Sequence, residues 1–121
     1  MGKRIAGKAY VKVDSKQYTL AGSLTVMVDE EEREGLVGLS GVAGYKETPL
    51  IPFIEAEYFA TDELSLKDIG KITDATVTAE LANGKTYVLR NAWSSGSREL
   101  DGAEGTLTIK FEGISGEEIK A

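Results

Sequence analysis

The sequence contains no cysteine and no histidine. The missing cysteines exclude disulfide bonds and thiolate nucleophiles, and the missing histidines exclude imidazole bases. Ser-His-Asp and Cys-His catalytic sets therefore cannot form within the chain. Zinc sites built from these two ligands are excluded for the same reason. The lack of cysteine also fits a protein made in a reducing cytoplasm.

Basic residues are scarce relative to acidic ones, with 14 Lys and Arg against 20 Asp and Glu and a net charge of -6. Binding to phosphates requires clustered basic residues, so this balance excludes a protein that holds nucleic acid tightly. It also argues against attachment to an anionic membrane surface. No apolar run reaches the length of a membrane span, and the basic N-terminus lacks the apolar stretch of a secretory signal. We therefore expect no membrane anchor.

The strongest positive signal is the alternation of apolar and polar residues, which is typical of strands with one buried face. It runs through 9–13, 17–28, 53–59, 75–93 and 105–112. The 121 residues suffice for a single domain, 1–121. This pattern predicts a mainly β fold: a small antiparallel sandwich or partly open barrel of six or seven strands with one short helix. Residues 62–70 are the candidate helix, with Thr61 as its cap and Gly70 at its end.

The register of the hairpin at 75–93 can be tested by its apolar residues. A two-residue Asn-Gly turn would divide them between the two faces of the hairpin. A three-residue loop at 82–84 instead places Ala79 opposite Tyr87 and Val77 opposite Leu89, with Gly84 in a left-handed conformation. We prefer this register, because a slip of one residue would turn every side chain to the other face.

The middle and the end of the chain are less regular. We read 29–34 as a solvated connection, followed by a strand to about Leu39 and a long mobile loop through 41–49. Loops of this length usually carry function or are disordered, and this one holds enough apolar residues to dock on another surface. Residues 94–97 read as a loop. The glycine-rich and acidic residues 114–121 read as a mobile C-terminal arm or as a short segment that becomes ordered on assembly.

Candidate chemistry is sparse, and we expect no enzyme, no cofactor and no metal site. Glu55 and Glu57 could in principle act on a glycosidic bond, but two carboxylates at this spacing more often form the wet face of a strand. A small carbohydrate-binding sandwich would need aromatic residues converging on these acids, and Tyr58 lies on the opposite face. Strands with Thr76, Thr78 and Glu80 also present a polar face, past which a partner could slide without sticking.

Four segments together resemble the tail tube protein of Mu-like contractile-tailed phages and prophages. They are RIAGKAYVKVD (4–14), GVAGYKETP (41–49), LANGKTYVLRNAW (81–93) and GTLTIKFEG (105–113). The resemblance runs nearly end to end and implies six-membered rings stacked into a hollow tube through which DNA passes. It implies a β-barrel similar to that of the hemolysin-coregulated ring protein of type VI secretion. In that family the sheets of neighbouring subunits join around the lumen.

The resemblance also implies partners and places. The partners are other copies of the chain, the tail sheath, baseplate and tape-measure proteins, and DNA as passing cargo. The place is the virion tail, assembled in the cytoplasm of the bacterial host. A ring protein of a phage-derived device that injects protein, a tailocin or a type VI-like system, remains the alternative.

Two sets of residues follow from the match. The loop at 38–51 corresponds to the segment that reaches the adjacent ring, and its apolar anchors are Leu39, Val42, Tyr45, Pro49, Leu50 and Ile51. The candidate lumen-facing residues are Glu55, Glu57, Thr76, Thr78 and Glu80. The sequence does not say which strands line the lumen.

Overall fold

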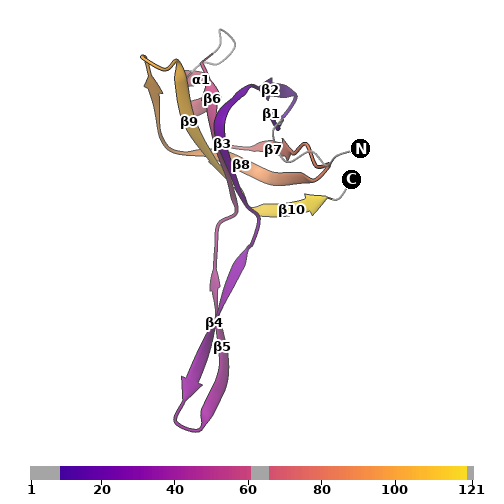
Figure 1. The fold of residues 1–121 in the computed structure, drawn as a ribbon, viewed down its shortest axis with the longest axis vertical. Helices are drawn as coiled ribbons and strands as arrows, with labels where there is room; N and C mark the ends of the chain where they lie inside the picture. Colours follow the sequence, from indigo (N-terminus) through magenta and orange to yellow (C-terminus); the bar gives the residue numbers. More distant parts are fainter. Residues whose placement is uncertain (1–8, 61–65, 120–121) are drawn as a thin grey trace.

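The structure is a computed structural model that describes residues 9–60 and 66–119. In these residues the chain forms ten strands and one short helix (Figure 1). The strands are β1 (Tyr10–Val13), β2 (Lys16–Tyr18), β3 (Leu20–Met27), β4 (Glu31–Gly38), β5 (Gly41–Pro49), β6 (Phe53–Phe59), β7 (Ala75–Glu80), β8 (Thr86–Asp101), β9 (Thr106–Glu112) and β10 (Ser115–Ile119), and the helix is α1 (Leu66–Gly70). The predicted class, a mainly β antiparallel and open sandwich, is confirmed.

Eight strands form one continuous antiparallel sheet with the order β2-β1-β7-β8-β9-β6-β3, and β10 pairs with β8 beside this path. The long strand β8 belongs to both layers of the sandwich. Its first half, up to Ala92, pairs with β7 and β10, and its second half, 93–101, pairs with β9. We call the first layer, made of β2, β1, β7, the first half of β8 and β10, the β7 layer. The second layer, made of the rest of β8 with β9, β6 and β3, is the β6 layer; Figure 1 shows its strands crossing those of the β7 layer.

The core lies between the two layers, where alternate residues of each strand meet. Strand β6 buries Ile54, Ala56 and Tyr58. These belong to one cluster with Val77 of β7 and Ile69 of α1. The remaining members of the cluster are Val11, Val13, Tyr18, Ala75, Ala79, Leu89, Ala92, Leu107, Ile109 and Phe111. The sequence alternation therefore identified the buried face of each of these strands correctly.

The predicted register of the hairpin between β7 and β8 is confirmed. Val77 is opposite Leu89 and Ala79 is opposite Tyr87. The Leu81 N–H donates to the Lys85 carbonyl at 2.9 Å, and Gly84, with φ 93°, turns the chain. A left-handed residue at this position favours glycine because it has no Cβ.

The helix is confirmed from Leu66 to Gly70, and the predicted first part at 61–65 lies outside the described residues. Ile69 is its buried anchor. Because five residues cannot sustain a helix alone, the contact of Ile69 with the core is what holds α1 in place.

Three predictions of irregular structure are wrong. The predicted strand to about Leu39 is present, but it begins at Glu31, within the predicted connection 29–34, and the predicted loop 41–49 is a second strand. Glu31–Gly38 and Gly41–Pro49 pair as the antiparallel strands β4 and β5. Residues 94–97 lie within β8, where its register against β9 shifts between Ser95 and Glu99. Instead of a mobile arm, Ser115–Ile119 forms β10 against the first half of β8. The Nε atom of Arg90 donates to Glu117 Oε1 at 2.7 Å and ties the two strands together.

Candidate assembly surfaces

The hairpin of β4 and β5 projects away from the body of the molecule (Figure 1), and every residue of both strands is exposed. Its stem is held by charges that pair across the two strands. Arg33 Nε lies 3.4 Å from Glu47 Oε2, and Lys46 Nζ lies 3.1 Å from Glu34 Oε1. Glu31, through its charge and a side-chain hydrogen bond, raises the pKa of Glu47. The stem thus satisfies its own polar groups without help from the sandwich.

The tip of the hairpin, residues 35–45, carries no charge at all. Val37, Leu39 and Val42 are 81%, 110% and 85% exposed. Gly41 and Gly44 have φ values of 117° and 131°, which lets the strands turn at the end and bulge beside Leu36. Exposed apolar groups gathered on a projecting element are typical of a contact surface, because water gives them no stabilisation.

The residues predicted as anchors of the 38–51 segment fall into two groups. Leu39, Val42 and Tyr45 lie on the tip or just below it. Pro49, Leu50 and Ile51 lie at the other end, where the Leu50 N–H donates to the Glu30 carbonyl at 2.9 Å and closes the hairpin root. Sequence reasoning missed Leu36 and Val37 as tip residues, because they lie before the predicted loop.

The outer face of the β6 layer is polar and weakly acidic. Glu55 of β6 is opposite Thr25 of β3 on one side and Lys110 of β9 on the other. Among the described side chains of β6 and β9, this face carries three carboxylates and one ammonium group. The carboxylates are those of Glu55, Glu57 and Glu112, and the ammonium group is that of Lys110. Lys110 Nζ lies 4.4 Å from the centre of the Phe53 ring, and the Ser95 hydroxyl donates to Glu112 at 2.7 Å.

The five candidate lumen residues do not share one face. Glu55 and Glu57 alternate with buried residues of β6, so they point outward from the β6 layer. Thr76, Thr78 and Glu80 alternate with buried residues of β7 and point outward from the β7 layer. Because both layers cover the same core, the two groups face different sides of the molecule. Glu80 is paired there with Lys12, whose Nζ lies 3.8 Å from Glu80 Oε1.

The β6 layer has two edges, β3 and the second half of β8. In the described part of the chain no strand pairs with the far side of either. Both edges carry the same irregularity. Leu20 and Leu24 of β3 face residues only two apart in β6, and Ser95 and Glu99 of β8 face residues only two apart in β9. Each edge therefore has two extra residues. The bulge of β3 lies at the row of Glu57 and Thr108, and the bulge of β8 lies at the adjacent row of Ala56 and Ile109.

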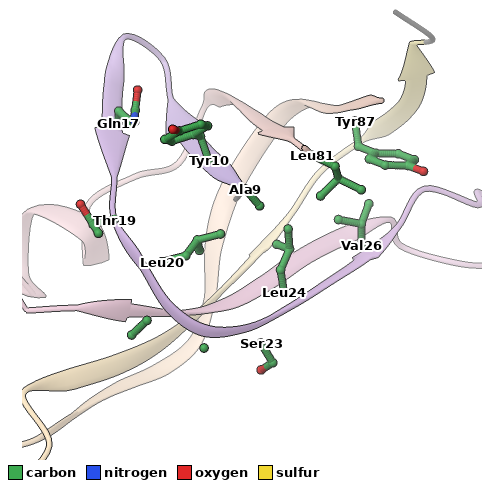
Figure 2. A pocket seen from close by; sticks show the side chains of 12 residues that line it. Ala9, Tyr10, Gln17, Thr19, Leu20, Ser23, Leu24, Val26, Leu81 and Tyr87 are labelled. Carbon is green, nitrogen blue, oxygen red and sulfur yellow. The ribbon is translucent and has the colours of Figure 1, made fainter. Parts of the chain in front are cut away.

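A groove of about 820 Å³ lies where β3 passes the β1–β2 hairpin and the turn between β7 and β8. Leu20, Leu24 and Val26 point into it from β3 (Figure 2). Tyr10 and Leu81 face them from the β7 layer. None of the residues that line the groove is charged, although 28% of the chain is. The groove lies between the two ends of the strand order, β2 and β3, where the sheet does not close into a barrel. We call this gap the open seam.

Among the side chains that the structure describes, no three acidic groups gather closely enough to hold a metal ion. Residues 9–60 and 66–119 include no helix that is long and apolar enough to cross a membrane.

Comparison with known sequences gives a match over nearly the whole chain. The family model described as phage tail tube protein matches residues 2–118. The Mu-like prophage FluMu tail tube protein of Haemophilus influenzae is 29% identical over 114 residues, which cover 94% of this chain and 95% of that protein.

Solved structures share the fold at low sequence identity. One is the sheath/tube terminator of an extracellular contractile injection system, PVC, in its extended state. It has a TM-score of 0.68 and 13% identity and covers 98% of both chains. Another is Hcp1 from Flavobacterium johnsoniae, with a TM-score of 0.62 and 13% identity over 93% of this chain and 95% of that one.

Proposed function

Because this chain belongs to the phage tail tube protein family, we propose that it assembles into hexameric rings that stack into a hollow tube for the passage of DNA into a host cell. The observation that carries the ring is the β6 layer: four strands with a polar outer face and two open edges that match. An open edge exposes unpaired backbone groups, which a monomer must protect and an assembly can use.

Rotation of one copy about a ring axis brings β3 beside the second half of β8 from the next copy. The four strands of the layer alternate in direction, so β3 and β8 run opposite ways. Because four is an even number, the joined sheet stays antiparallel through every junction. The contact uses different surfaces on the two copies, which is the kind of contact that builds a ring when the rotation between copies closes, and it is not that of a two-fold dimer. The bulges are compatible with this pairing, since each edge carries two extra residues and the two bulges lie in adjacent rows.

Six copies supply about 24 strands, and at roughly 4.8 Å per strand the sheet has a circumference on the order of 115 Å. Such a sheet encloses a channel rather than a packed core. We place the outer face of the β6 layer, with Glu55 and Glu57, toward this channel. Thr76, Thr78 and Glu80 then belong to the outside of the ring. A weakly acidic lumen repels phosphates, so DNA is cargo and not a bound ligand.

The hairpin supplies the contact between rings. It extends away from the body at one end of the long axis, and its uncharged tip, with Leu39, Val42 and Tyr45, is the part of the 38–51 segment that reaches the adjacent ring. The tail sheath, baseplate and tape-measure proteins are the further partners, in a virion tail assembled in the host cytoplasm. A ring that delivers protein in an injection device is the alternative, favoured only by the fold shared with the PVC terminator.

Electron microscopy of the concentrated protein tests this function. We expect rings with six-fold symmetry in end views and stacked rings in side views. A protein that stays monomeric at high concentration, by mass photometry and by microscopy, would contradict the proposal. Rings of another copy number would contradict the hexamer alone.

A further inference from the structure

Leu100 is an apolar side chain that points toward the core side of its sheet but has no core to enter. It is paired in register with Leu107, which is 3% exposed, whereas Leu100 itself is 50% exposed. The difference arises because β8 is the last strand of the β6 layer on this side. Removing a leucine side chain from water stabilises a protein, and Leu100 gains only part of this stabilisation in one copy.

The other edge of the same layer has the opposite defect, an uncharged groove with three apolar side chains along one wall and no side chain to fill it. Leu20, Leu24 and Val26 are packed against the core on one side and line the open groove on the other. Figure 2 shows their side chains directed from β3 into this space. Leu20 and Leu100 lie on one row of the sheet, which runs Leu20, Tyr58, Leu107, Leu100 across the four strands.

We propose that Leu100 of one copy enters the groove of the next copy beside Leu20, so that the neighbour completes the core at the open seam. This inference rests on the proposed ring, in which β8 of one copy meets β3 of the next. Paired strands point their side chains to the same side of the sheet at each row. We assign the junction the register that sets Leu100 of one copy next to Leu20 of its neighbour, because this register brings the half-exposed Leu100 to the side where the groove lies. The uncharged lining imposes no desolvation of ions when the leucine enters.

The absence of cysteine makes a direct test possible, because two introduced cysteines are the only thiols in the chain. The test variant carries L20C and L100C, and a disulfide requires Cα atoms about 4.4–6.8 Å apart. We expect mild oxidation of assembled rings to give a reducible ladder of linked copies that ends at the ring number. The control is the L100C/T78C pair, since Thr78 lies on the outer face of the β7 layer. The control and both single variants should stay mainly monomeric on a denaturing gel.

Failure of this inference and failure of the proposed function give different results. If microscopy shows rings but L20C/L100C links no better than L100C/T78C, the docking of Leu100 is wrong and the ring stands. A disulfide that runs as a compact monomer would also overturn the docking. If neither wild type nor variant forms rings, the proposed function fails and the docking fails with it.

A second pair of variants, L100D and L100M, tests the docking even if the cysteine variants do not fold. L100D places a charge on an already exposed side chain, so circular dichroism and the melting temperature should change little. The concentration at which half of the protein forms rings should rise by tenfold or more, whereas L100M should keep it within about threefold. Equal assembly of L100D and wild type would overturn the docking.

Discussion

Gly116 of β10 lies against Val28 with no space for another carbon between them. A Cβ built on Gly116 would be 2.9 Å from the Cβ of Val28 and 3.1 Å from the Cβ of Pro52. Val28 precedes the β4–β5 hairpin and Pro52 follows it, so one residue of the C-terminal strand touches both sides of the hairpin root. The Gly113 N–H also donates to the Pro52 carbonyl at 3.0 Å. β10 therefore braces the hairpin.

Replacing Gly116 by alanine should force this brace apart. Overpacking of this kind typically costs about 1–3 kcal/mol, and the neighbours include the Cα of Val28 at 3.0 Å, a backbone atom that cannot turn aside. We expect G116A to lower the melting temperature and to speed amide hydrogen exchange at 28–31 and 50–51. G102A is the matched control, because nothing lies within 4 Å of a Cβ at Gly102. Equal exchange in the two variants would show that β10 does not hold the hairpin root.

Tyr58 carries the one buried side-chain polar atom without a hydrogen-bond partner among the described residues. Its ring meets that of Tyr18 edge to face, with centroids 5.7 Å apart. A buried hydroxyl without a partner loses its hydration and gains nothing in exchange. We expect Y58F to raise the free energy of unfolding by about 1 kcal/mol. Urea denaturation measures this, and a loss of stability would mean that the hydroxyl has a partner.

The same hydroxyl gives a dependence on pH. Burial, together with the charge of Tyr18, raises the pKa of Tyr58 in the folded protein above its ordinary value of about 10. Above pH 10 the unfolded chain loses this proton while the folded chain keeps it, so the free energy of unfolding falls as the pH rises. Below pH 10 both states are protonated and Tyr58 contributes no slope. We expect wild type to lose about 1 kcal/mol more than Y58F between pH 10 and 11. Parallel curves would refute this role of Tyr58.

A charge at the hairpin tip should separate ring formation from stacking. Val42 is exposed and opposite Val37, so V42D should leave the fold and the single rings intact. Because the carboxylate would have to be desolvated at the contact, tubes should shorten to single rings in side views. T48D is the control, since Thr48 is equally exposed but lies on the charged stem. Long tubes of V42D would exclude the tip as the stacking contact.

Charge reversal tests which layer lines the channel. E55K replaces an acid on the outer face of the β6 layer, and E80K makes the same change on the β7 layer. In a phage carrying E55K, added phosphate attraction along the lumen should slow the ejection of DNA, and the delay should shrink at higher salt. E80K should eject at the wild-type rate. The reverse result would place the β7 layer toward the channel.

The sequence predicted the sandwich well where each strand buries one face. Alternation at Ile54, Ala56 and Tyr58 marked the core, and the same pattern fixed the register of Val77 against Leu89. The alternation did not predict the strands that bury no side chains in the core. β4 and β5 pair only with each other, so no apolar face marks them, and β10 is held by backbone hydrogen bonds that glycine and glutamate supply as well as any residue.

The candidate site was predicted less completely, for a related reason. The wet faces of β6 and β7 look alike in sequence, so Glu55 and Thr78 could not be assigned to different sides. Leu100 follows residues that read as a loop, and its exposure depends on the order of strands in the sheet, which is a property of the whole chain.

The hairpin and the body occupy opposite ends of the long axis of the molecule (Figure 1). In a ring generated by rotation alone, every hairpin projects from the same face of the ring. A stack of such rings is therefore directional: one end displays free hairpin tips and the other displays surfaces that have not received them. The two ends need different proteins to start and to stop growth, and subunits cannot add to both ends by the same contact.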